Sequence, residues 1–169
     1  MKEIYLAGGC FWGLEKYISL IPGVVYTEVG YANGRTENPT YEEVKYENTG
    51  HAETVLVRYL PETLDLPTLL MRFFEVIDPT AINRQGEDEG TQYRTGIYYT
   101  DKADQEIIEA ALIALQTQLE EQVQIEAGLL RDYTSAEAYH QKYLDKNPGG
   151  YCHIGSEQFQ RLQKLAKKV

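Results

Sequence analysis

Two glycines, a cysteine and two large aromatic residues adjoin near the N-terminus, in the motif Gly8-Gly9-Cys10-Phe11-Trp12-Gly13. An apolar run, Ile4 to Ala7, precedes the motif and a helix-like pattern, Leu14 to Leu20, follows it. We therefore expect a strand, a tight turn and a helix, with the thiol at the turn. The unpaired N–H groups and the dipole of a helix N-terminus favour a thiolate. With Phe11 and Trp12 as an apolar wall, the motif predicts a nucleophilic cysteine that acts on a small, partly apolar electrophile.

The doubled glycine and the helix start favour this interpretation of Cys10 over a small buried residue that fills space. The second cysteine, Cys152, lies in the glycine-rich segment Asn147–Ser156. It is a free surface thiol, a metal ligand with His153, or a resolving cysteine that attacks an oxidised Cys10 to form a disulfide. One adjacent pair without a CxxC motif gives a metal site little support. A loop flanked by glycines suits a thiol that must move inward.

A carboxylate, Glu53, ends the motif Thr49-Gly50-His51-Ala52-Glu53, before an apolar strand. It is either an exposed group at a strand edge or a general acid. A general acid would need a pKa raised by burial. For His51 we prefer a loop residue bonded to the backbone over a catalytic base.

Tyrosine is frequent, with 14 copies, most of which we expect to serve in packing. Tyr41 and Tyr93 differ because they lie at the edges of irregular segments, where a phenolic O–H can donate to a ligand oxygen. Asp88 shares a loop with Tyr93 and is by default a solvated acid. These side chains form the remaining candidate site.

Length and charge limit the possible functions. We expect residues 1–169 to form a single catalytic domain, in which the C-terminal segment 147–169 carries Cys152 and a terminal helix. The net charge of −10 argues against nucleic-acid binding.

No window suits a transmembrane span or a signal peptide, so we expect no membrane partner and a cytoplasmic protein. In that compartment cysteines are more often free or catalytic than structural. The sequence has no Walker motif, no G-x-G-x-x-G and no G-x-S-x-G.

The positioning elements follow a mixed α/β pattern. Runs rich in β-branched and aromatic residues predict strands at Glu3–Ala7, Val24–Tyr31, Glu53–Tyr59, Arg94–Tyr99 and Val123–Glu126. Apolar periodicity predicts helices at Phe11–Ser19, Thr40–Tyr46, Leu66–Ile77, Lys102–Glu120, Ala136–Leu144 and Glu157–Lys168. Asp101 is placed to cap the fourth of these helices. Asp78–Gln92 and Asn147–Ser156 fit no regular element.

Six motifs together resemble the methionine sulfoxide reductase A family. They occur in the family's order and span nearly the whole chain: Gly8–Gly13, Val29–Gly34, Thr49–Glu53, Gly90–Arg94, Ala138–Leu144 and Asn147–Cys152. The resemblance implies an α/β (α+β) fold, with a mixed β-sheet flanked by helices in a ferredoxin-like two-layer arrangement. It also implies an oxidoreductase that reduces the S epimer of methionine sulfoxide, free or in proteins.

The family's site residues carry over by position. The resemblance implies that Cys10 attacks the sulfoxide sulfur and that Glu53 gives a proton to the oxygen. It implies further roles for the side chains around them: Tyr41 and Tyr93 bind the oxygen, Phe11 and Trp12 hold the S-methyl group, and Asp88 helps to order the site. Cys152 would resolve the Cys10 sulfenic acid as a disulfide. An external dithiol, thioredoxin, would reduce that disulfide, with no bound cofactor or metal.

Some family members have a second cysteine in the C-terminal segment, but residues 153–169 contain none. Thioredoxin would therefore have to reach the Cys10–Cys152 disulfide itself. We expect a monomer whose partners are oxidised proteins, free methionine sulfoxide and thioredoxin. Two alternatives stay open: another two-cysteine thiol enzyme such as a peroxidase, and a non-enzymatic module that binds methionine-like side chains.

Overall fold

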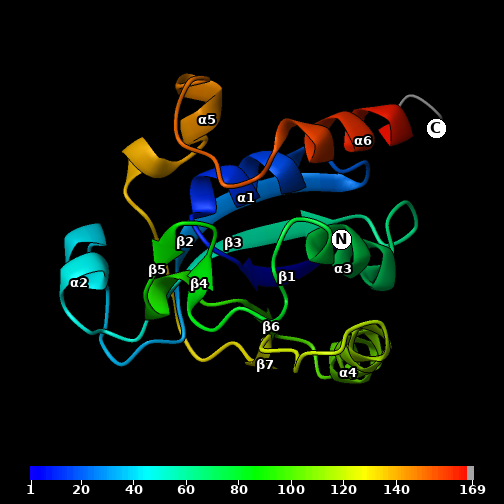
Figure 1. Ribbon diagram of the computed structural model, residues 1–169. Helices are drawn as coiled ribbons and strands as arrows, with labels where there is room; N and C mark the ends of the chain where they lie inside the picture. Colours follow the sequence, from blue (N-terminus) through cyan, green and yellow to red (C-terminus); the bar gives the residue numbers. More distant parts are fainter. Residues whose placement is uncertain (167–169) are drawn as a thin grey trace.

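A six-stranded mixed sheet forms the centre of the protein in the computed structural model, which describes residues 1–166 (Figure 1). The strand order is β7-β6-β1-β3-β2-β8, and every neighbouring pair is antiparallel except β6 and β7. The strands are β1 (Lys2–Ala7), β2 (Val24–Ala32), β3 (Ala52–Tyr59), β6 (Gly96–Tyr99), β7 (Glu126–Leu129) and β8 (Tyr133–Ser135). A separate small ladder pairs β4 (Arg84–Gln85) with β5 (Asp88–Glu89).

The helices complete a ferredoxin-like unit. Strands β1, β2, β3 and β6, in the order β6-β1-β3-β2, alternate with two packed helices in a βαββαβ arrangement, which confirms the predicted fold class. The helical segments are α1 (Phe11–Ser19), α2 (Tyr41–Tyr46), α3 (Leu66–Phe74), η1 (Thr91–Tyr93), α4 (Ala103–Thr117), η2 (Ala138–His140), α5 (Tyr143–Lys146) and α6 (Ser156–Ala166). Within the described residues, none of these helices is long and apolar enough to cross a membrane.

The main core lies between the sheet and the helices α1 and α3. Successive side chains of a strand point to opposite faces, so Ile4 and Leu6 enter this core while Tyr5 joins a smaller cluster on the other face. In β3 the same alternation places Val55 in the main core. Glu53, two residues earlier, therefore points to the helix-covered face, toward α1.

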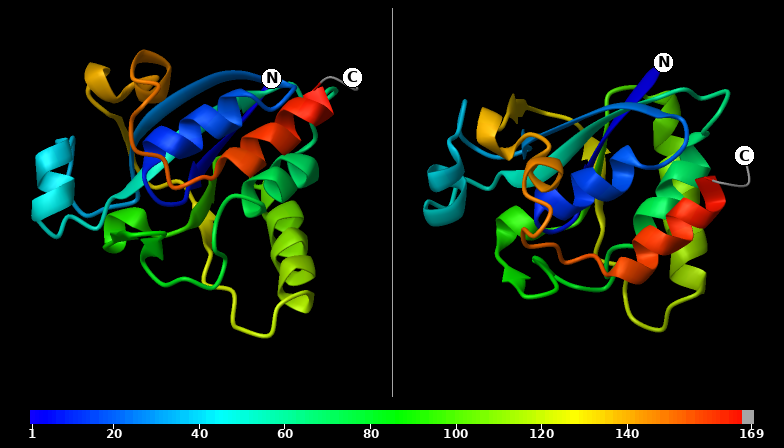
Figure 2. Two further views of the ribbon diagram at one scale, coloured as in Figure 1. Left: turned by 45° about the horizontal axis from the view of Figure 1, so that its top comes forward. Right: turned by 90° about the horizontal axis from the view of Figure 1, so that it is seen from above.

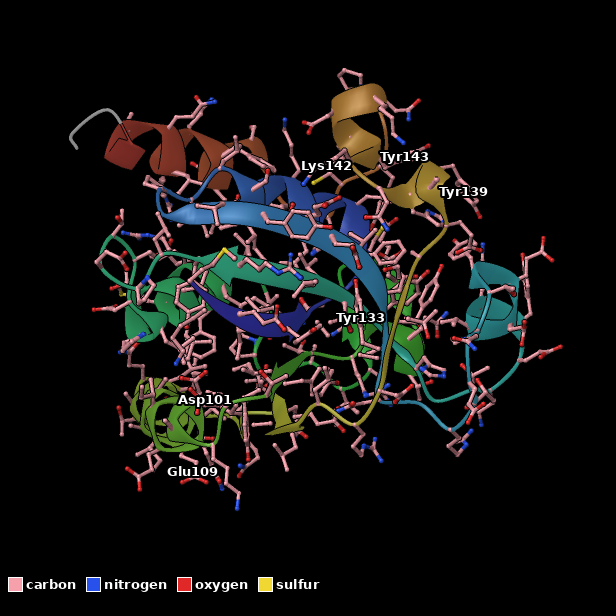
Figure 3. All side chains as sticks on the ribbon, turned by 180° about the vertical axis from the view of Figure 1, so that it is seen from behind. Asp101, Glu109, Tyr133, Tyr139, Lys142 and Tyr143 are labelled. Atoms are coloured by element: carbon pink, nitrogen blue, oxygen red, sulfur yellow. The ribbon has the colours of Figure 1, made fainter. Side chains whose placement is uncertain are left out.

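Further segments cover both faces (Figure 2). Helix α6 lies along α1, where Phe159 meets the ring of Tyr17 edge-on at 5.7 Å. Leu130 and Tyr133 pack on the face without helices, and Figure 3 shows Tyr133 beside β2. The chain thus returns from β7 across the open face of the sheet before it reaches the C-terminal segment.

Most predicted elements occur where expected. Helix α1 has the predicted bounds, Thr40 caps α2 through its side chain, and Asp101 accepts the N–H of Ala103 (2.9 Å) at the start of α4 (Figure 3). The predicted C-terminal helix corresponds to α6, and its last two predicted residues, Lys167 and Lys168, lie outside the described residues.

The predicted helix Ala136–Leu144 is wrong. The chain forms the short turn η2, extends at Gln141, and takes a left-handed conformation at Lys142 before α5. The Gln141 side-chain amide accepts the N–H of Val29 (2.9 Å) and donates to its carbonyl oxygen (2.8 Å). Lys142 reaches the buried carboxylate of Glu15 (3.1 Å). These bonds to distant elements override the local helical pattern.

The predicted strand Val123–Glu126 is shifted. The strand β7 begins at Glu126 and runs parallel to β6. Two of the earlier residues bond elsewhere: the Val123 N–H donates to Gln116 (2.8 Å) and the Gln124 N–H donates to the carbonyl oxygen of Pro79 (2.7 Å). Val123 and Gln124 therefore anchor the loop after α4, and the residues from Glu126 onward pair with the sheet.

Candidate active site

Cys10 lies where β1 gives way to α1. Strand β1 ends at Ala7, and Gly9 has a left-handed conformation (φ +80°) that lets the chain turn. Cys10 is the N-cap residue of α1 and is only 8% exposed. The Gly9 N–H donates to the carbonyl oxygen of Tyr93 (3.3 Å), which ties this turn to η1. The predicted strand, turn and helix around the thiol are confirmed.

Burial of Cys10 favours the protonated thiol and so opposes the thiolate expected at a helix N-terminus. Burial raises the pKa of Cys10 far above its usual value, and the charge of Glu53 acts in the same direction. The backbone N–H of Trp12 lowers the pKa, as the position at a helix N-terminus predicts, but it does not outweigh burial. The thiol proton must therefore leave as the sulfur reacts.

Glu53 shares the N-terminus of α1 with Cys10. The residue is 2% exposed, and its Oε1 accepts the N–H of Phe11 (3.2 Å). Burial raises the pKa of Glu53 to about 8, although the Phe11 N–H opposes this shift. The carboxyl group is thus largely protonated at neutral pH, as a general acid must be. The alternative of an exposed carboxylate at a strand edge is wrong.

One pocket of about 260 Å³ gathers most of the predicted site residues. Its supporting elements meet at the end of the sheet where α1 begins (Figure 1). Seven of its lining residues were singled out from the sequence: Cys10, Phe11, Trp12, Tyr41, Glu53, Asp88 and Tyr93. The pocket therefore sets a thiol, an acid, hydroxyl donors and an aromatic wall around one small volume.

The two candidate tyrosines reach the pocket from opposite segments. Burial raises the pKa of Tyr41 to about 12 and that of Tyr93 further, so both keep their phenolic protons and can donate. The N–H of Tyr41 donates to Oε2 of Glu137 (3.0 Å), whose Oε1 accepts from the hydroxyl of Tyr31 (2.8 Å). Glu137 thereby fixes the start of α2 against the sheet.

Asp88 lies on β5, in the segment predicted to be irregular. A buried amide organises this segment: Gln85 accepts the N–H of Asp78 (2.8 Å) and donates to the hydroxyl of Thr95 (2.9 Å). Asp88 accepts a hydrogen bond from the hydroxyl of Tyr151 (3.0 Å), so it also anchors the C-terminal segment. The loop is therefore a small fixed ladder at the edge of the pocket.

Cys152 does not line this pocket. It is half-buried in the segment between α5 and α6 and lines a neighbouring groove of about 540 Å³ between α1, α5 and α6. Both cysteines are free thiols. Burial raises the pKa of Cys152. The two thiols face different cavities.

A sequence model described as peptide methionine sulfoxide reductase matches residues 2–168. The chain belongs to the peptide methionine sulfoxide reductase family. A relative from Lachnoclostridium phytofermentans, described as MsrA, is 60% identical over 154 residues, which cover 91% of this chain and 93% of the relative. The structure of Mxr1 from Saccharomyces cerevisiae in reduced form has a TM-score of 0.86 at 36% identity and covers 91% of each chain. Mxr1 in complex with Trx2 has a TM-score of 0.60 at 26% identity and covers 84% of each chain.

In this reductase, Trp12 is supported by two residues, His140 and Tyr143, for which no individual role was predicted. The indole N–H of Trp12 donates to Nδ1 of His140 (2.9 Å), and the indole stacks on Tyr143 at 3.7 Å. Figure 3 shows Tyr143 and Tyr139 on the segment after β8, near α1. Burial lowers the pKa of His140, which keeps Nδ1 free to accept. Sequence spacing cannot reveal this contact, because the residues lie far apart along the chain.

Some further side chains of the reductase lie in the pocket and others lie outside it. Lys45 and Tyr151 also line the pocket, although the sequence did not single them out. His51 lies outside the pocket, buried, with Nε2 2.7 Å from the carbonyl oxygen of Thr36, so its interpretation as a loop residue bonded to the backbone is confirmed. Among residues 1–166, no cluster of three His, Cys, Asp or Glu side chains is arranged to hold a metal.

The raised pKa of Glu53 predicts a stability effect that can be measured apart from activity. Folding must protonate a carboxylate that is ionised in the unfolded chain above pH 4.5, so stability falls as the pH rises from 4.5 to about 8. Glu53→Gln should remove this penalty, which amounts to roughly 1.4 kcal/mol per pH unit across that range. Urea unfolding at pH 4.5, 7 and 8.5 should show a gain that starts near zero and grows with pH. The exposed Glu62→Gln control should show no such trend, and a pH-independent difference for Glu53→Gln would refute the buried acid.

Proposed function

We propose that this chain reduces methionine S-sulfoxide, free or in oxidised proteins, to methionine. The observation that carries the proposal is the pairing of a buried thiol and a protonated carboxyl group at the N-terminus of one helix, Cys10 and Glu53, inside an aromatic pocket. A sulfoxide sulfur is a poor electrophile until its oxygen is protonated. The reaction therefore needs a nucleophile and an acid side by side, which this pocket provides.

In the first step, the Cys10 sulfur attacks the sulfoxide sulfur while Glu53 protonates the oxygen. The hydroxyls of Tyr41 and Tyr93 donate to the same oxygen as negative charge develops on it. The net reaction transfers one oxygen atom: methionine leaves as the thioether, and Cys10 becomes a sulfenic acid. Proton number is conserved, because the thiol hydrogen of the reactants appears as the sulfenic hydrogen of the product.

The apolar wall gives the site its selectivity. Phe11 and Trp12 hold the S-methyl group, and this contact fixes the orientation in which the sulfoxide presents its sulfur to Cys10 and its oxygen to Glu53. The rigid support of Trp12 by Tyr143 and His140 favours one orientation of the chiral sulfur. Asp88 keeps the C-terminal segment attached to the pocket rim through Tyr151.

Cys152 completes the cycle. Its thiol attacks the sulfenic sulfur of Cys10, water leaves, and a Cys10–Cys152 disulfide forms. A thioredoxin then reduces this disulfide directly, with no further cysteine and no bound cofactor. A homologue solved in complex with Trx2 supports this partner, and so does the groove that reaches Cys152 from outside the substrate pocket. A cytoplasmic monomer fits this cycle, because the cytosol keeps such thiols reduced.

The variant Cys152→Ser tests this proposal. Without the resolving thiol, the enzyme should release about one methionine per protein from methionine S-sulfoxide and then stop, with a sulfenic acid on Cys10. Rapid quench and chromatography measure the methionine, and a 1,3-dicarbonyl probe with peptide mass spectrometry locates the oxidised residue. Thioredoxin-driven turnover at the rate of the unmodified enzyme would show that Cys152 is not the resolver. The absence of any methionine in the first turnover would refute the proposed reaction.

A further inference from the structure

The third residue of α1, Gly13, lies directly against the sulfur of Cys152. A methyl group built on Gly13 would stand 2.7 Å from Sγ of Cys152, closer than side-chain carbon atoms approach a sulfur. The next atoms are Nδ1 of His153 at 3.6 Å and Cα of Cys152 at 3.7 Å, both ordinary contacts. The sulfur alone therefore occupies the space of a side chain at position 13.

Helix geometry makes this position special. Cys10 is the N-cap and Gly13 is the N3 residue of α1. In a capping box, the side chain of each of these two positions bonds to the backbone N–H of the other, so the two positions lie close together. Here N3 has no side chain, and the thiol of a distant segment takes its place. The sulfur of Cys152 thus lies against the first turn of α1, the helix that Cys10 begins.

The residues on either side of Cys152 hold the thiol in this position. Tyr151 donates to Asp88 (3.0 Å). The ring of His153 lies against Gly9, where a methyl group would stand 3.2 Å from both Cε1 and Nε2. Cys152 is therefore already docked on α1 in the reduced protein, between two anchors.

Local helix energetics do not explain a glycine at this position. Gly13 has no left-handed backbone angle, so alanine fits its conformation. Inside a helix, alanine is favoured over glycine by about 1 kcal/mol. What opposes a side chain at position 13 is the sulfur of Cys152 and not the helix itself.

We propose that Gly13 is a positioning residue. Because it has no side chain, the sulfur of Cys152 can lie against α1 in the position from which it attacks the sulfenic acid on Cys10. In that step the S–O bond of Cys10 breaks and the S–S bond forms. The sulfenic sulfur is reduced, the Cys152 sulfur is oxidised, and the thiol proton leaves with the hydroxyl group as water. The inference rests on the proposed function, since it concerns the resolving step of that cycle.

The variant Gly13→Ala tests this positioning role. Methionine release and disulfide formation are both measured in one turnover of reduced enzyme with methionine S-sulfoxide and no reductant. We expect about one methionine per protein at close to the normal rate. Disulfide formation, which thiol alkylation and mass spectrometry monitor, should slow by tenfold or more. A misplacement of about 1 Å can lower a rate about a hundredfold. A 1,3-dicarbonyl probe should then trap a longer-lived sulfenic acid on Cys10.

Gly128→Ala provides the matched control. Gly128 lies in β7, and a methyl group there would meet no described atom within 4 Å. Both steps should keep their normal rates in this variant. A normal rate of disulfide formation in Gly13→Ala would overturn the proposed role of Gly13. An equal fall in the rates of methionine release and disulfide formation would also overturn it, because Gly13 would then act on Cys10. Failure of the unmodified enzyme to release methionine would instead overturn the proposed function.

Stability measurements keep the inference testable if Gly13→Ala folds poorly. A double-mutant cycle combines Gly13→Ala with Cys152→Ala and compares the free energies of unfolding of the four proteins. If the sulfur causes the clash, alanine at position 13 should destabilise the protein that contains Cys152 and not the Cys152→Ala background. Equal destabilisation in both backgrounds would overturn the proposal.

Discussion

Replacing Cys10 with serine is expected to abolish reduction of methionine S-sulfoxide. Serine is nearly the same size, so the pocket should keep its shape around the N-terminus of α1. Its hydroxyl group is a far weaker nucleophile than a thiol and cannot form a sulfenic acid. Methionine formation with a dithiol reductant should fall to the rate seen without enzyme, in single-turnover and steady-state assays alike.

Binding provides the control for Cys10→Ser. Trp12 is the one tryptophan of the chain and lines the pocket, so its fluorescence reports on occupancy. The variant should still bind methionine sulfoxide with a change in this signal while it produces no methionine. Multi-turnover reduction by the variant would contradict the mechanism. A biological function that survives the substitution unchanged would favour a non-enzymatic module that binds methionine-like side chains.

Replacing Glu53 with glutamine should slow the first step about a hundred- to ten-thousand-fold, the usual effect of losing a general acid. Glutamine keeps a carbonyl oxygen that can accept the N–H of Phe11, so α1 keeps its start. It cannot give up a proton to the sulfoxide oxygen. Rapid-quench measurement of methionine with excess enzyme isolates this step from recycling.

Two controls separate loss of the acid from loss of the site. Cys10 in Glu53→Gln should still react with a small alkylating reagent, which shows that the thiol is present and accessible. The exposed Glu62→Gln should leave the first step unchanged. A near-normal rate for Glu53→Gln at every pH would rule out the acid role.

Local patterns predicted the elements around the thiol well. The apolar run before Gly8, the periodicity after Trp12 and the capping residue Asp101 are signals within a few residues of the features they set. In β3 the alternation of side chains places Glu53 on the same face as the core residue Val55. These sequence signals act over a few residues, and the elements that they predict occur in the structure.

Tertiary contacts decided the features that local patterns missed. Gln141 and Lys142 leave the helical path because β2 and Glu15 offer them better partners. His140 supports Trp12 across a separation that no spacing rule covers. The raised pKa of Cys10 is a similar case, since burial by the whole fold outweighs the local effect of the helix N-terminus.

The most direct test of the central claim is a thioredoxin-coupled assay with the two separated epimers of methionine sulfoxide. In the proposed binding mode the methyl group lies against Phe11 and Trp12 and the oxygen against Glu53, so only one configuration at sulfur should place the sulfur within reach of Cys10. We predict sustained turnover of the S epimer and none of the R epimer. Turnover of both epimers, or of R alone, would contradict this account of the site.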